Sequence, residues 1–292
     1  MRFAFGYSEA KLTARNCRQN MAPDPHILVG RYGRVAVLEL GSDIVEHAHP
    51  QAQGLIKIDG PDRTILVDGR HHMLRDDTMV LLRPWVPHGG LAAEGASTRV
   101  FAVNLDLPRE NVGRARAVAQ RDRAGDGVCH RIGQDLREAA DYLRQRLARG
   151  QATAGDADEL LRCFSRAWAS ADLAGEGTQA SGIDFRIRRV IEHIRTAPAD
   201  TQNVDVWVKI SGLSRPHFFH LFRQCTGVTP RLYANSLRLE YAIDRLSNSS
   251  APIHAVAESL GFRAPSHFTR FFLHHLGSTP RAYRHGVHGF AH

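Results

Sequence analysis

The sequence predicts an α+β protein of several domains, β-rich in its N-terminal part and all-α at its C-terminal end. Short apolar runs separated by turn residues fill positions 26–108. From about position 110, apolar residues recur at the three- and four-residue spacing of amphipathic helices. In the last 110 residues, a pattern of glycine, phenylalanine, proline and tyrosine occurs twice. With 292 residues, the chain is long enough for two domains with separate cores.

The β-rich part is assigned to residues 1–110, of which the first 25 show no regular pattern. Its apolar runs start about ten residues apart, and glycine, aspartate and proline lie between them. This arrangement is typical of an antiparallel sandwich or small barrel. The predicted strands are 35–40, 55–58, 64–67, 78–82 and 99–105.

Residues 111–175 are predicted to be a helical coupling segment. In its first helix, 134–148, Leu136, Ala140 and Leu143 share one face, and Gly150 is a stop signal. A second helix is predicted over about 156–174. Residues 176–182 are small and polar and indicate a flexible linker.

The near-repeat lies in residues 183–286 and predicts two helix–turn–helix units. Asn203 or Asp205 is expected to cap the first helix of the first unit, Ser214 its second helix, and Pro252 opens the second unit. A longer helix over about 231–246 would hold the units apart. The repeated residues are Gly212, Phe218, Phe222, Gly227, Pro230 and Tyr233, and then Gly261, Phe268, Phe272, Gly277, Pro280 and Tyr283.

The second helix of each unit is predicted to have an apolar inner face and an outward face that contacts a partner. The predicted inner residues are Phe218, Leu221 and Phe222 in one copy, and Phe268, Phe271 and Phe272 in the other. The outward residues are Arg215, Phe219, His220 and Arg223 in the first copy, and Ser266, His267, Thr269 and Arg270 in the second.

Charge is concentrated in the same region. The chain carries a net charge of +8, and residues 183–292 hold 14 Arg and Lys against 7 Asp and Glu. The remainder is therefore nearly neutral. A basic C-terminal domain predicts a polyanionic partner for that domain. Two reading helices about 34 Å apart, one turn of duplex, would enter the same face of DNA.

The segment 261–284, GFRAPSHFTRFFLHHLGSTPRAYR, resembles the signature of the AraC/XylS transcription regulators, and the resemblance covers about 184–285. It implies base-reading positions at Pro216, Phe219 and His220, and at Ser266, Thr269 and Arg270. Arg215 and Arg223 are expected on phosphates or in solvent. The first unit departs from the family pattern, because Phe219 and His220 stand where polar or arginine side chains are common. The resemblance implies promoter DNA, a small-molecule effector and a homodimer formed by the coupling helices, with RNA polymerase as a further partner of an activator. The alternative for these helices is packing against the β-rich domain.

The β-rich part also resembles the cupin fold, on two partial motifs. Gly41-x5-His47-x-His49-x3-Gln53-x6-Gly60 is similar to the first motif, with Gln53 in place of glutamate. The segment 84–88 (PWVPH) is similar to the end of the second motif and would bring His88 to the same interior. The expected effector-binding residues are His47, His49, Gln53, Trp85 and His88. Trp85 is either a pocket wall or barrel packing.

Without the motif carboxylate, we predict no metal and no cofactor, with His47, His49 and His88 as the candidate ligands if a metal binds. The alternatives are a metal sensor or a cupin enzyme with an attached DNA-binding domain. A general nucleic-acid binder is a weaker rival. Four scattered cysteines and no apolar stretch of about 20 residues indicate a cytoplasmic protein without a membrane partner. The sequence contains no phosphate loop or nucleophile–histidine pattern, so we do not expect an enzyme.

Overall fold

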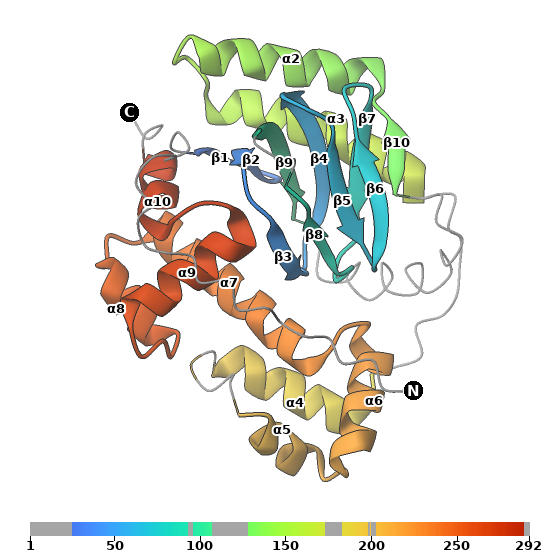
Figure 1. The fold of residues 1–292 in the computed structure, drawn as a ribbon, viewed down its shortest axis with the longest axis vertical. Helices are drawn as coiled ribbons and strands as arrows, with labels where there is room; N and C mark the ends of the chain where they lie inside the picture. The colour runs from blue at the N-terminus through green and yellow to red at the C-terminus, as the bar shows by residue number, and fades with distance from the viewer. Residues whose placement is uncertain are drawn as a thin grey trace.

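The computed structural model describes residues 25–92, 96–106, 128–172, 183–197, 199 and 203–288. The irregular N-terminus, the linker at 176–182 and the first part of the coupling segment lie outside the described residues. The chain forms a sheet-rich N-terminal domain and a helical C-terminal domain (Figure 1). Within the described part, no helix is long and apolar enough to cross a membrane.

Two antiparallel sheets build the N-terminal domain. The larger has the order β1-β2-β9-β4-β7-β10 and the smaller the order β3-β8-β5-β6. The larger sheet contains β1 (His26–Gly30), β2 (Gly33–Leu40), β4 (Ala52–Asp59), β7 (Thr78–Leu82), β9 (Thr98–Leu105) and β10 (Cys129–Arg131); the smaller contains β3 (Ile44–His47), β5 (Arg63–Val67), β6 (Arg70–Leu74) and β8 (His88–Gly90).

The five predicted strands are all present, as β2, β4, β5, β7 and β9. The other strands are short or polar, so they carry no alternating signal. One of them corrects the purely helical reading of the coupling segment. Cys129 in β10 pairs with Val80 in β7, which adds a strand from this segment to the larger sheet.

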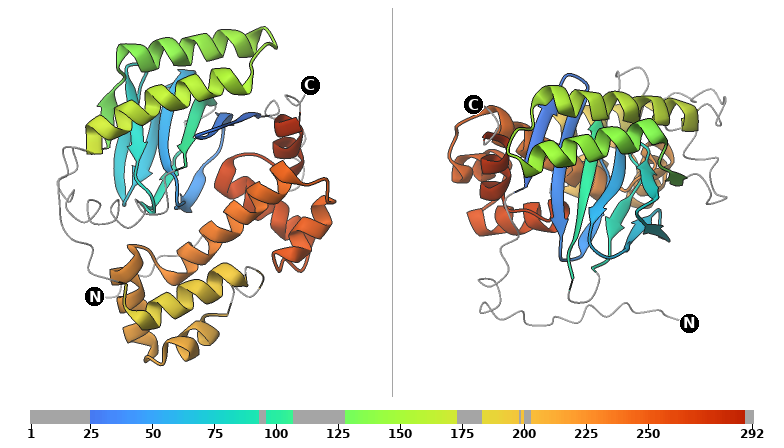
Figure 2. Two further views of the ribbon diagram at one scale, coloured as in Figure 1. Left: turned by 180° about the vertical axis from the view of Figure 1, so that it is seen from behind. Right: turned by 90° about the horizontal axis from the view of Figure 1, so that it is seen from above.

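Two helices from the coupling segment, α2 (Gln134–Ala148) and α3 (Ala154–Asp172), cover one face of the larger sheet (Figure 2). Both lie where periodicity placed them. Phe164 of α3 is fully buried against Gly54, where an added Cβ would come 2.5 Å from the ring. A side chain at Gly54 would therefore push α3 off the sheet. The alternative of packing against the β-rich domain matches this placement, and dimerisation stays a prediction.

The C-terminal domain consists of α4 to α10, with a long central helix between two similar helical hairpins. Asn203 caps α5 by accepting a hydrogen bond from the backbone of Asp205, and Thr229 caps α7. Gly212, Gly227 and Gly277 end helices in the left-handed conformation. The helices are α4 (Phe185–Thr196), α5 (Val204–Ser211), α6 (Arg215–Thr226), α7 (Pro230–Asn248), α8 (Ile253–Ser259), α9 (Pro265–Leu276) and α10 (Pro280–His288).

The two domains are packed together rather than merely tethered. One hydrophobic cluster runs from the inner strands of the sheet domain into α7, α8, α9 and α10. A separate cluster under the first hairpin takes in Ala48 and the side of Trp85 from the sheet domain. Both hairpins thus share apolar contacts with the domain that contains the histidines.

Candidate functional site

The first hairpin, α5–α6, buries the predicted aromatic core and leaves polar residues outside. Trp207, Phe218 and Phe222 are completely buried. His220 and Arg223 are exposed, as expected. Ser214 occupies the N-cap position of α6 without a side-chain capping bond. Leu221, predicted as an inner residue, is only half-buried.

The start of α6 is held by polar and aromatic contacts of its own. The guanidinium of Arg215 donates to Asp205 of α5 at 2.5 Å and lies 5.8 Å from the Phe219 ring centroid. Phe219 is half-buried and meets Phe218 edge-to-face, with ring centroids 5.6 Å apart. One side of Phe219 thus joins the core, and the rest remains at the surface beside exposed Pro216.

The second hairpin, α8–α9, presents a more polar outward face. Ser266, His267 and Arg270 are exposed, whereas Phe268 and Phe272 are completely buried. Thr269 is half-buried, and its hydroxyl donates to the Pro265 carbonyl at 3.0 Å. This bond reduces the capacity of Thr269 to donate elsewhere.

The prediction that Phe271 is fully buried is wrong. Phe271 is half-buried, because it lies at the edge of the core between Phe262 and His275. Its ring stands 4.3 Å from that of His275.

Between the hairpins, α7 is a rigid spacer. Its 19 residues give a length of about 28 Å at 1.5 Å per residue. This length is comparable to the 34 Å between successive turns of a duplex. Figure 1 shows α7 running from the α4–α6 bundle to the α8–α10 bundle.

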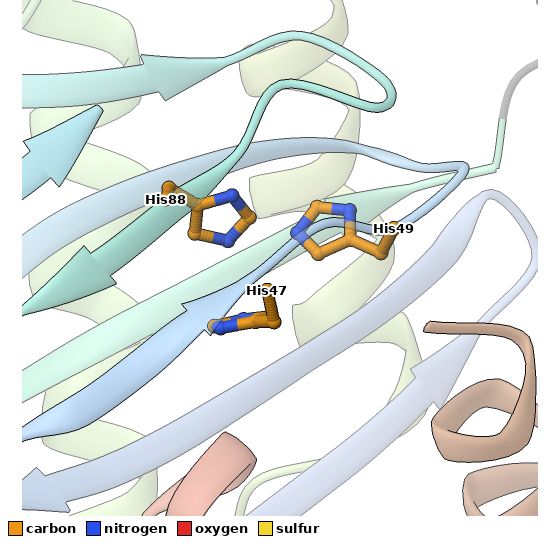
Figure 3. A group of neighbouring side chains, drawn as sticks. All are labelled: His47, His49 and His88. Atoms are coloured by element: carbon orange, nitrogen blue, oxygen red, sulfur yellow. The ribbon is translucent and has the colours of Figure 1, made fainter. Parts of the chain in front are cut away.

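His47, His49 and His88 lie together in the sheet domain (Figure 3). All three side chains are buried, and one ring nitrogen from each lies within 4.8 Å of the others. Pairing of β3 with β8 sets His47 directly opposite His88. The partial motifs therefore predicted the right three histidines, although His88 comes one position early in its motif.

A hydrogen bond to the backbone fixes each imidazole. Nδ1 of His47, His49 and His88 lies 2.9, 3.0 and 2.9 Å from the carbonyl oxygens of Val45, Gln51 and Val86. A carbonyl oxygen only accepts, so each Nδ1 carries the proton and each Nε2 keeps a free lone pair.

The cluster holds these rings in the neutral form. Burial, together with the neighbouring imidazoles, lowers the pKa of His49 to about 4 and that of His88 to about 3. For the same reasons the pKa of His47 lies well below its usual value. At neutral pH the cluster is therefore a set of lone-pair donors rather than a cationic patch.

The other two predicted effector residues lie apart from this arrangement. Gln53 lies on β4 in the larger sheet, where its amide donates to Asn104 at 2.9 Å. Trp85 stacks on Tyr233 of α7, with ring centroids 4.4 Å apart. Trp85 thus packs against the helical domain, and Gln53 pairs across strands.

An ion pair between the domains was missing from the sequence interpretation. Both guanidinium NH groups of Arg34 on β2 donate to Glu240 on α7, at 3.1 and 3.3 Å. Gln51 donates to the same carboxylate at 2.9 Å. Arg34 and Glu240 are 206 residues apart, and no local pattern links them. The one available signal was a glutamate beside Leu239 on an otherwise apolar stripe of α7.

A hollow of about 480 Å³ lies between the sheet domain and the first hairpin. Glu46 and Asp68 line it from the sheet domain, and Arg223 and Arg231 line it from the helical domain. This second concave region combines acidic and basic groups, unlike the neutral histidine cluster.

The helix-turn-helix domain family HTH_18 matches residues 207–286. The transcriptional activator RclR of Escherichia coli K12, described as specific for RCS, is 33% identical over 106 residues, which cover 36% of this chain and 37% of RclR. The regulator MtrA of Neisseria gonorrhoeae is 27% identical over 127 residues, or 43% of this chain and 41% of MtrA. The chain thus matches well under half the length of these curated relatives.

The likeness of fold extends over most of the chain. ToxT from Vibrio cholerae strain SCE256, solved with a bound unsaturated fatty acid, superposes with a TM-score of 0.51. The match covers 87% of this chain and 95% of ToxT at 14% identity, so it establishes the fold alone. Taken with the matched helical hairpins, these relatives show that the chain belongs to the AraC/XylS family of transcription regulators.

Proposed function

We propose that this chain is a sequence-specific transcription regulator in which α6 and α9 enter the grooves of promoter DNA. The carrying observation is the matched pair of hairpins, each with a buried phenylalanine core and an exposed polar face on its second helix. Arg270 is the strongest candidate base reader, because arginine pairs bidentately with guanine. Pro216, His220, Ser266 and His267 lie exposed on the same two helices, while the half-buried Phe219 and Thr269 offer smaller surfaces.

The N-terminal domain is proposed to receive the effector. Its two sheets suit the cupin-like barrel that the motifs suggest, and a ToxT of the same fold binds an unsaturated fatty acid. His47, His49 and His88 offer buried acceptors for a ligand, and Gln53 and Trp85 are candidates for its outer contacts. Effector binding would act by favouring one arrangement of the domains.

The remaining partners follow the family. The protein would act in the cytoplasm as a homodimer, and it would contact RNA polymerase if it activates transcription. The rival interpretation as a cupin enzyme is disfavoured, since the curated relatives of the C-terminal domain are named as regulators and activators. Gln53 also lacks the carboxylate of the cupin motif.

A competition experiment tests the proposal. A promoter fragment from beside the gene and a random duplex of equal length compete for the full chain at fixed salt. We expect the promoter fragment to bind at least about a thousandfold more tightly. Equal affinity for both duplexes, lost steeply with added salt, would instead identify a non-specific nucleic-acid binder.

A further inference from the structure

The three buried histidines form a donor set that the polar groups around them do not satisfy. Nε2 of His49 and Nε2 of His88 are buried without a hydrogen-bond partner. Since each Nδ1 carries the proton, these nitrogens are acceptors without a donor. An unsatisfied buried acceptor costs about 1–3 kcal/mol, so two of them facing a common centre point to a ligand that accepts electron pairs.

The donor set fits a divalent transition metal. Three histidine nitrogens with a fourth position left open are a common Zn²⁺ site. Metal-bound histidines regularly donate their other ring N–H to a backbone carbonyl, as His47, His49 and His88 all do here. Zn–N bonds of about 2.0–2.1 Å place tetrahedral ligands about 3.4 Å apart. The nitrogens now lie within 4.8 Å of one another, so small ring movements would complete the coordination.

Each histidine is also connected to the helical domain. The ring of His47 lies 6.1 Å from that of His275 on α9. His49 donates to the Gln51 carbonyl, and the Gln51 amide donates to Glu240 on α7. His88 follows Trp85, whose backbone N–H donates to the His49 carbonyl at 2.8 Å. Movement of the three rings would therefore reach both helices through short contacts.

We propose that His47, His49 and His88 bind one divalent transition-metal ion through Nε2, and that this ion is the effector, read by α7 and α9 through Glu240 and His275. The metal-binding half stands by itself. The regulatory half rests on the proposed DNA-binding function. Gln51 and Glu240 are positioning residues in this proposal, because they act on the metal through His49.

Metal binding is measured on the full chain without an affinity tag, after chelator treatment. Zn²⁺ is titrated by calorimetry, and Co²⁺ by its visible absorption, which is intense only in four-coordinate sites. We expect one ion per chain with micromolar or tighter affinity. His49→Gln and His88→Gln should each weaken binding at least a hundredfold, while His254→Ala, at an exposed histidine of α8, should bind like the parent. Circular dichroism of each variant verifies folding.

The metal site is refuted if the parent takes up no Zn²⁺ or Co²⁺ at micromolar concentration. It is also refuted if both folded histidine variants retain parental affinity, which would put the ion elsewhere. A bound amine or another hydrogen-bond donor, found instead of metal by mass analysis of the untreated protein, would refute the site as well.

The regulatory half is tested by operator affinity with Zn²⁺ and with chelator. We expect at least a tenfold difference for the parent and a smaller one for Glu240→Gln, whose Zn²⁺ affinity should also drop about tenfold. Zn²⁺ binding with no change in operator affinity would overturn the regulatory half alone. Loss of all operator preference, with Zn²⁺ still bound, would defeat the proposed function and leave the metal site standing.

Discussion

Trp85 of the sheet domain stacks on Tyr233 of α7, with ring planes inclined by 17° and centroids 4.4 Å apart. Trp85 holds a left-handed backbone conformation, φ 63°, which non-glycine residues rarely adopt. A conformation of this kind persists only where surrounding contacts hold it. The stack therefore joins a strained loop next to His88 to the helix that spaces the two hairpins.

Replacing Trp85 separates the contributions of its ring and its backbone. Trp85→Ala should destabilise the chain by about 1–2 kcal/mol, because it loses an aromatic pair and keeps the strained φ. Trp85→Gly should be more stable than Trp85→Ala by about 1 kcal/mol, since glycine adopts positive φ freely. Urea unfolding measures both. Tyr142→Ala on α2, where 53% of the side chain is exposed, is the control and should match the parent. Equal stability of Trp85→Ala and the parent would contradict the assignment.

The Arg34–Glu240 pair predicts acid sensitivity of the contact between the domains. Burial raises the pKa of Glu240, but the charge and hydrogen bonds of Arg34 outweigh it, so the net pKa lies below the ordinary value of 4.5. A carboxylate with a lowered folded pKa contributes stability that is present above 4.5 and lost as pH falls through the folded value. We expect the free energy of unfolding to fall in this window, and to fall less in Glu240→Gln.

Urea unfolding from about pH 6 to about pH 3 measures this effect. At neutral pH, Glu240→Ala should cost about 3 kcal/mol, the lower end for breaking a buried pair, because 18% and 17% of the two side chains remain exposed. Asp106, near Arg34, contributes in the opposite sense, since burial raises its pKa. Identical pH profiles of the parent and Glu240→Gln would show that Glu240 is not the titrating group.

The C-terminal helices could be predicted from the sequence because their signals are local. Phe218 and Phe268 share their spacing with a turn glycine and a later proline and tyrosine, so each copy supports the other. The longer strands also followed from local alternation. The three histidines were found because β3 and the segment before β8 carry recognisable motif fragments.

What the sequence did not predict is the contact between the domains. Arg34 and Glu240 meet only because β2 and α7 pack together, and that packing depends on apolar residues spread over both domains. Trp85 was ambiguous for the same reason, since its partner Tyr233 lies in the other domain. Short strands such as β8 escaped because three residues show no periodicity.

Arg270 and Arg223 are expected to act on DNA in different ways. Arg270→Ala should weaken operator binding by about 1–3 kcal/mol with little effect on random DNA. Arg223→Ala should weaken both, and reduce the slope of log K against log salt by about 0.9, as expected for one lost phosphate contact. Both side chains are exposed, so folding should not change. Fluorescence anisotropy over a salt series distinguishes them, and parental operator affinity in Arg270→Ala would remove this residue from the reading set.

The turn glycines of the two hairpins differ in their surroundings, which gives a matched pair of substitutions. Gly212 and Gly261 have φ of 66° and 75°. Around Gly212 an added Cβ meets no atom within 4 Å, so Gly212→Ala should cost about 1–2 kcal/mol from the backbone conformation alone. At Gly261 the Cβ would lie 2.4 Å from the Ala199 carbonyl oxygen, so a steric cost is added. Gly261→Ala should therefore be more destabilising than Gly212→Ala in urea unfolding, and the opposite order would mean that Ala199 moves aside at little cost.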